Sequence, residues 1–81
     1  MIFVTILVVA PDKCNKVYEV IKDLKTPKDI RILSSYGLFG EYDAVLIYEA
    51  PDHDTAMDFL LDVCKIGGII DTKTFAATQL R

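Results

Sequence analysis

Hydrophobic residues along this chain follow two different patterns. Ile2–Val9 is apolar at nearly every position and is followed by Pro11, which is typical of a strand buried on both faces. Between Pro11 and Pro27 the apolar residues recur every three or four positions, at Cys14, Val17, Tyr18, Ile21 and Leu24. This spacing predicts an amphipathic helix that begins near Pro11-Asp12 and ends before Pro27.

The rest of the chain repeats the strand and helix patterns. Ile30–Ser35 alternates and predicts a less apolar strand, whereas Ala44–Tyr48 is apolar on both sides. Asp52 is the expected N-cap of a second helix, which Gly67-Gly68 ends. The apolar arc of this helix spans roughly 200°, so it predicts either packing against the first helix or a further contact. The mild alternation of Ile69–Leu80 predicts a fourth strand.

The element order β-α-β-β-α-β predicts a ferredoxin-like α+β fold, with one domain over residues 1–81. Right-handed crossovers place both helices on one face of a four-stranded antiparallel sheet with the strand order 4-1-3-2. The central strands are then the two segments that are apolar on both faces. This agreement supports the predicted topology.

The predicted sheet has a second apolar face that its own helices cannot cover. Leaving several such side chains in water would cost several kcal/mol, at ~25 cal/mol per Å² of apolar surface. We therefore expect a second copy of the chain to cover this face, which gives a homodimer or a higher even oligomer. Tyr48, within the third strand, is expected at that interface. The alternative is an exposed patch on a monomer.

Composition and charge exclude several classes of protein. The chain has 81 residues, 52% of them hydrophobic, and a net charge of −3. Its nine Lys and Arg residues are scattered, so direct binding to nucleic acid is not expected. The apolar start, Ile2–Ala10, is shorter than the ~18 residues that a membrane span needs and lacks a basic flank. No membrane association is predicted.

The two cysteines, Cys14 and Cys64, lie far apart, each on the apolar face of a predicted helix. With a single histidine in the chain, neither a disulfide framework nor a zinc site is expected. Two reduced, buried thiols fit a cytoplasmic location. No motif for a cofactor, a metal or a serine-histidine-acid triad is present, so we assign no cofactor and no catalytic residue.

The segment between the second and third strands holds most of the candidate chemistry. Glu41 and Asp43 lie on one side of an extended chain, where they can hold a ligand ammonium, act as an acid-base pair, or serve as solvated turn residues. Tyr36 and Tyr42 can line a pocket or pack in a core or interface. His53 is a possible base or metal ligand, but its place at a helix start beside Asp52 and Asp54 favours an exposed, partly charge-paired histidine.

The sequence Gly40-Glu41-Tyr42-Asp43, followed by Ala44–Asp52, resembles the GYD-domain family, and Gly68–Thr74 resembles the glycine and strand that follow the second helix there. The resemblance covers Tyr36 to Leu80 and implies a dimeric α/β barrel without a settled function. A more distant resemblance is to the amino-acid-sensing domain of Lrp/AsnC-type regulators. In that family a related turn lies near an effector site between subunits, which implies Gly40–Asp43 here. The first strand begins at Ile2, so a preceding helix-turn-helix and direct DNA binding are not inherited.

Three functions follow from these observations. The first is a non-enzymatic homo-oligomeric domain that binds or senses a small, amino-acid-like metabolite, with Tyr36, Gly40, Glu41, Tyr42 and Asp43 as ligand-binding residues. The second is a small cofactor-free enzyme of the dimeric α/β-barrel type, resembling monooxygenases or isomerases, that uses Asp43, Tyr42 or His53. The third is an oligomerisation module without a ligand.

Overall fold

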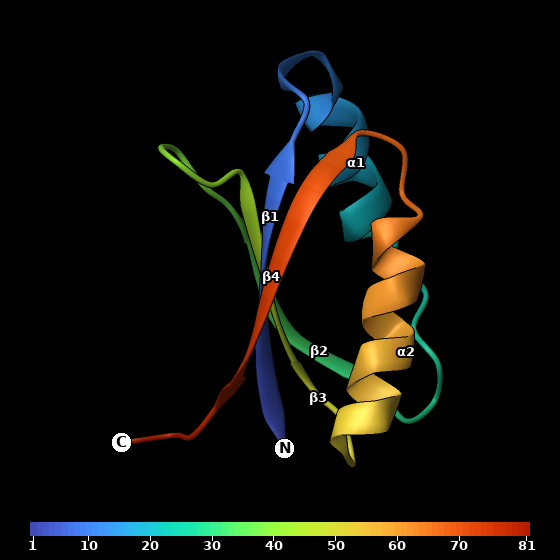
Figure 1. Cartoon of the computed structure of the whole chain (residues 1–81), viewed down its shortest axis with the longest axis vertical. Helices are drawn as coiled ribbons and strands as arrows, with labels where there is room; N and C mark the ends of the chain where they lie inside the picture. Colours follow the sequence, from blue (N-terminus) through green and yellow to red (C-terminus); the bar gives the residue numbers. More distant parts are fainter.

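The computed structural model describes residues 1–81, in which the elements follow the order β1-α1-β2-β3-α2-β4 (Figure 1). The strands are β1 (Ile2–Val9), β2 (Arg31–Gly37), β3 (Ala44–Glu49) and β4 (Ile69–Ala77). The helices are α1 (Cys14–Lys22) and α2 (His53–Cys64), and a short 3₁₀ turn, Pro11–Lys13, precedes α1. The predicted element order is confirmed.

The four strands form one antiparallel sheet in the order β2-β3-β1-β4. This is the predicted order 4-1-3-2 counted from the opposite edge. Both helices lie on the same side of the sheet (Figure 1). The apolar strands β1 and β3 occupy the centre, so the predicted ferredoxin-like topology is confirmed.

The core lies between the sheet and the helices. Alternate residues of β1 and β3, such as Leu7 and Leu46, point to this side and are fully buried. Helices α1 and α2 complete the core with Val17 and Phe59. The prediction that Tyr48 lies at an interface is wrong. Its side chain lies on the same face of β3 as that of Leu46, it is fully buried in the core, and its ring packs against that of Phe59.

The opposite side of the sheet, which we call the open face, carries a second set of apolar side chains. Val4 pairs with Ile47 on one side and with Phe75 on the other, and in the next row Ile6 lies between Val45 and Lys73. Phe75 keeps 52% of its surface exposed, and Tyr36, opposite Val45, keeps 59%. The prediction of an apolar face that the helices leave uncovered is therefore confirmed.

Several element ends differ from the prediction. The chain turns through a 3₁₀ segment at Pro11–Lys13 before α1 begins at Cys14, and α1 ends at Lys22. Strand β4 ends at Ala77 and not Leu80, because Ala77 already pairs with Ile2, the first residue of β1. The predicted N-cap of α2 is confirmed, since the Asp52 carboxylate accepts a hydrogen bond from the Thr55 N–H at 2.7 Å.

The prediction of two buried thiols is wrong. Cys64 is exposed and Cys14 is only half-buried, and both are free. Cys64 lies in the last turn of α2, where its sulfur is 3.7 Å from the Thr72 hydroxyl at the start of β4. Along the same helix Met57 and Leu61 each keep 55% exposure, so α1 does not cover the whole apolar arc of α2.

No helix has the length and apolar character that crossing a membrane would require.

Candidate functional site

The predicted site residues lie on and beside the loop that joins β2 to β3. The Leu38 N–H donates to the Asp43 carbonyl at 2.9 Å and closes the base of this loop. Gly40 has φ of +135°, a conformation that favours glycine. The loop points away from the side on which both helices lie (Figure 1), and Phe39 within it is fully exposed. The Gly40–Asp43 turn is therefore held at its base and open at its tip.

Asp43 anchors the turn to the end of β1. Its carboxylate Oδ2 accepts a hydrogen bond from the Val9 N–H at 2.7 Å, and its own N–H donates to the Leu7 carbonyl at 2.9 Å. Val9 is only 3% exposed, so the carboxylate satisfies a backbone donor that water does not reach freely. Asp43 thus positions the turn, with one carboxylate oxygen already engaged by the chain itself.

Tyr18 of α1 fastens the turn from the other side. Its hydroxyl donates to the Asp43 carbonyl at 2.7 Å. A Cβ at Gly37 would lie 3.3 Å from the Tyr18 ring. Because glycine has no Cβ, the ring has room to pack closely against β2. Burial, together with Cys14 and Asp43, raises the pKa of the Tyr18 hydroxyl. The phenol therefore stays protonated and acts as a donor at neutral pH.

Glu41 and Tyr42 of the turn lie near Lys73 of β4. The Lys73 ammonium donates to the Tyr42 hydroxyl at 3.2 Å and lies 5.4 Å from the centre of its ring. The hydrogen bond to Tyr42, with the charges of Asp71 and Glu41 nearby, holds the pKa of Lys73 above its usual value. Neither Lys73 nor Glu41 belongs to a salt bridge. The turn and the neighbouring strand β4 thus present one carboxylate and one cation that no salt bridge neutralises.

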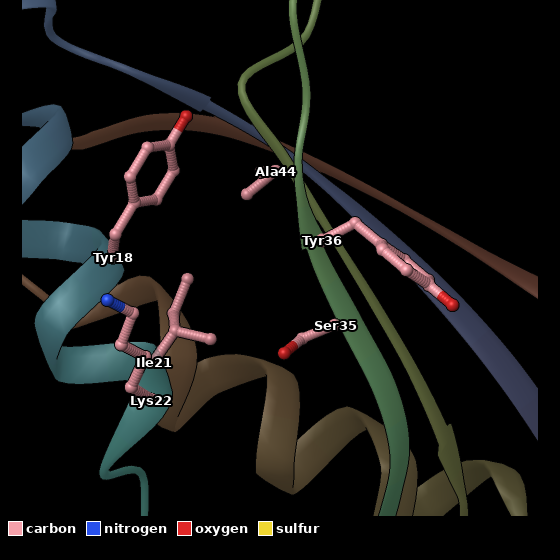
Figure 2. A pocket seen from close by; sticks show the side chains of 7 residues that line it. Tyr18, Ile21, Lys22, Ser35, Tyr36 and Ala44 are labelled. Atoms are coloured by element: carbon pink, nitrogen blue, oxygen red, sulfur yellow. The ribbon is translucent and has the colours of Figure 1, made fainter.

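Tyr36 borders a pocket, but its ring points away from it (Figure 2). This pocket, of about 200 Å³, lies between α1 and β2 and includes Tyr18, Ile21 and Ser35 in its lining. Figure 2 shows Ser35 pointing toward α1, whereas the Tyr36 ring points away to the other side of the sheet. Tyr36 therefore belongs to the open face, in the row that continues through Val45.

The structure divides the five predicted site residues by role. Gly40 bends the turn, Asp43 anchors it, Glu41 and Tyr42 lie exposed or half-buried at its surface, and Tyr36 lies on the open face. Sequence reasoning missed Lys73. The only feature that could have indicated it is its positive charge between two threonines of the last strand. Its proximity to Tyr42 depends on the register in which β4 pairs with β1, which the sequence alone does not specify.

His53 is exposed, in agreement with the sequence-based expectation, and its ring meets Phe3 edge-on at 5.4 Å. No group of three or more His, Cys, Asp or Glu side chains is placed to hold a metal ion.

A family profile described as "GYD domain" matches residues 10–80, nearly the whole chain. The chain belongs to the GYD-domain family. The match includes the Gly40–Asp43 turn together with both helices and the last strand. Among curated proteins, no sequence matches this GYD domain.

Solved structures with the same fold have low sequence identity to this GYD domain. The crystal structure of FFRP-DM1 matches with a TM-score of 0.77 at 23% identity, over 95% of this chain and 97% of that one. TTHA0845 from Thermus thermophilus matches with a TM-score of 0.79 at 17% identity, over 99% and 95% of the two chains. These similarities support the ferredoxin-like fold.

An AsnC family transcriptional regulator from Agrobacterium tumefaciens also matches, with a TM-score of 0.71 at 18% identity. The match covers 99% of this GYD domain but only 52% of the regulator. This agrees with the more distant resemblance to Lrp/AsnC-type regulators, and it concerns about half of the regulator's length.

Proposed function

We propose that this GYD domain is a homo-oligomeric binding or sensing domain that holds a small, amino-acid-like metabolite at the Gly40–Asp43 turn. The observation that carries the proposal is the pair of free charges at the turn, the Glu41 carboxylate and the Lys73 ammonium beside Tyr42. An amino acid has an ammonium and a carboxylate, which these two charges complement. The Tyr42 ring, whose centre lies 5.4 Å from the Lys73 ammonium, adds an apolar surface beside this cation.

The rigid attachment of the turn also supports a binding role. Asp43 and Tyr18 fix the base of the turn to β1 and α1 through three hydrogen bonds of 2.7 to 2.9 Å. A site that is held in place before the ligand arrives loses less conformational entropy on binding. Because Asp43 is used in this way, Glu41 is the carboxylate that we assign to the ligand.

The proposed oligomer forms through the open face. The centre of this face is apolar, with Val4, Ile6, Val45 and Ile47 in two adjacent rows. A charged group lies at each end: Arg31 and Glu49 form a salt bridge of 2.7 Å at one end, and Lys73 lies toward the other. An apolar centre with a polar rim is the usual anatomy of a protein interface.

A second copy packed on this face would lie next to the turn. The loop between β2 and β3, which contains the exposed Phe39, projects away from the helices toward the open side of the sheet (Figure 1), where it would contact the partner subunit. Lys73 lies on that face while Glu41 lies in the loop, so the proposed ligand would bind at the edge of the interface. The likeness in fold to the AsnC family regulator suggests a sensing role by analogy.

The contacts of Asp43 and His53 make the enzyme alternative weaker. Asp43 is bonded to the backbone of β1, and His53 packs edge-on against Phe3 without a salt bridge to an acidic side chain. Neither residue has the partner that would orient it as a base.

Native mass spectrometry of freshly purified protein tests the proposal. We expect even-numbered oligomers that carry a small molecule, which Glu41→Gln loses and which the matched control Asp58→Asn, an exposed carboxylate on α2, retains. Oligomers that stay bare after incubation with an amino-acid mixture would favour the oligomerisation module. Equal retention by Glu41→Gln and wild type would remove the ligand from the turn.

A further inference from the structure

A second pocket, on the helix side of the sheet, lies between α2 and β4. It has a volume of about 300 Å³ and is partly open. Its walls are mostly apolar, and its lining residues are Phe3, His53, Ala56, Met57, Leu60, Thr74 and Ala76. Thr74 neighbours Lys73 in sequence, but strand alternation places the two side chains on opposite faces of the sheet. The pocket is therefore separate from the Gly40–Asp43 turn.

A chain of three hydroxyl groups crosses the core and ends in this pocket. The Tyr48 hydroxyl is 2.9 Å from Thr5 Oγ1, and Thr5 Oγ1 is 2.8 Å from Thr74 Oγ1. Tyr48 is fully buried and Thr5 is 1% exposed, whereas Thr74 is half-buried at the pocket wall. The three groups belong to the adjacent strands β3, β1 and β4.

Burial determines which way the protons point along this chain. Each hydroxyl has one proton, and a buried proton without an acceptor is costly. Thr5 is the only hydrogen-bond partner of the Tyr48 hydroxyl, so Tyr48 must donate to Thr5. Thr5 has then already accepted from Tyr48 and must donate its own proton to Thr74. In this arrangement the Thr74 proton has no acceptor within the protein.

We propose that this pocket binds a small apolar molecule that carries one hydrogen-bond acceptor, such as a ketone or aldehyde, with the acceptor on the Thr74 hydroxyl. The apolar walls from Phe3, Met57 and Leu60 favour a hydrocarbon body, and Thr74 offers one oriented donor. A cavity of about 150 Å³ accommodates benzene in another protein, so this pocket has room for a substituted ring. The two preceding donors polarise the Thr74 hydroxyl and strengthen it as a donor.

The test uses two probes of the same shape. Acetophenone has a carbonyl where α-methylstyrene has a methylene group, so only acetophenone can accept a hydrogen bond. Each probe is titrated into the full chain, and the amide shifts in ¹H–¹⁵N NMR spectra give the site and the dissociation constant. We expect the shifts to centre on Met57, Leu60 and Thr74. Shifts centred elsewhere would overturn the proposal.

The variants then test the role of the hydroxyl group. Relative to the affinity for α-methylstyrene, Thr74→Val should weaken acetophenone binding by roughly twofold to tenfold, the usual range for one hydrogen bond. Thr74→Ser keeps the donor, and Thr72→Val changes a threonine outside the pocket, so both should keep the wild-type ratio. An unchanged ratio in Thr74→Val would refute the proposal.

Thr74→Val also removes the acceptor for the buried Thr5 proton, and this can affect folding. The triple variant Thr5→Val, Tyr48→Phe, Thr74→Val removes all three hydroxyls together and leaves no buried donor unpaired. It should show the same weakening toward acetophenone as the single variant, and a wild-type ratio in a folded triple variant would equally refute the proposal.

Discussion

Replacing Asp43 should destabilise the fold itself, whatever the turn binds. The Asp43 carboxylate is the hydrogen-bond acceptor of the Val9 N–H at 2.7 Å, and Val9 is 3% exposed. Asp43→Ala leaves this donor without a partner in a place that water reaches poorly. A buried donor left unpaired costs about 1–3 kcal/mol, so we expect a loss of about 2 kcal/mol in the free energy of unfolding. For a domain of this size the midpoint of thermal unfolding should fall by about 8–16 °C.

Urea unfolding followed by far-UV circular dichroism measures this loss at one fixed protein concentration. Asp43→Asn keeps an acceptor oxygen for Val9 without the charge, so its loss should be smaller, about 1 kcal/mol. Glu41→Ala is the matched control: it removes an exposed carboxylate that is in no salt bridge, and it should change stability by less than about 0.5 kcal/mol. If Asp43→Ala is as stable as Glu41→Ala, the anchoring role of Asp43 is wrong.

Three further predictions follow from other parts of the molecule. Gly68 has φ of +105°, and an added Cβ would lie 2.7 Å from Lys13 Cβ, so Gly68→Ala should lower the free energy of unfolding in urea by about 2 kcal/mol or more. Gly67 has open space around it, so Gly67→Ala should change the same quantity by less than about 0.5 kcal/mol. Equal losses in the two variants would contradict this account. In a double-mutant cycle, Thr5→Val and Tyr48→Phe should together cost about 1 kcal/mol less than the sum of the single losses, and additive losses would mean that the two hydroxyls are not coupled. The hydrogen bond from the Thr55 N–H lowers the pKa of Asp52 in the folded protein, so the carboxylate stabilises the fold above its unfolded pKa and loses this effect as pH falls through the lower folded pKa. Asp52→Ala should therefore reduce the acid-induced drop in stability below about pH 4. An unchanged pH profile of stability would count against the helix cap.

The fold could be predicted from the sequence because its strongest signals are local. The apolar runs of β1 and β3 and the helical period around Val17 specify the elements, and the short connections leave few topologies. Tyr48 shows where this reasoning fails. Both faces of β3 are apolar in the sequence, so the alternation of side chains along the strand did not indicate which face packs in the core.

The candidate site was less predictable, because its contacts depend on pairing across strands. The turn was found from its glycine, tyrosines and carboxylates, but the engagement of Asp43 with Val9 and of Lys73 with Tyr42 joins residues 34 and 31 positions apart. The hydroxyl chain from Tyr48 through Thr5 to Thr74 likewise needs the register of three strands. No local pattern in the sequence encodes such contacts.

Sedimentation velocity at micromolar concentration tests the central claim, that the open face is an interface between copies of this chain. The account predicts that the wild type is an even-numbered oligomer, that Ile47→Lys at the centre of the open face dissociates it, and that Leu61→Lys, on the exposed side of α2, leaves it intact. A wild-type chain that sediments as a monomer at this concentration would contradict it.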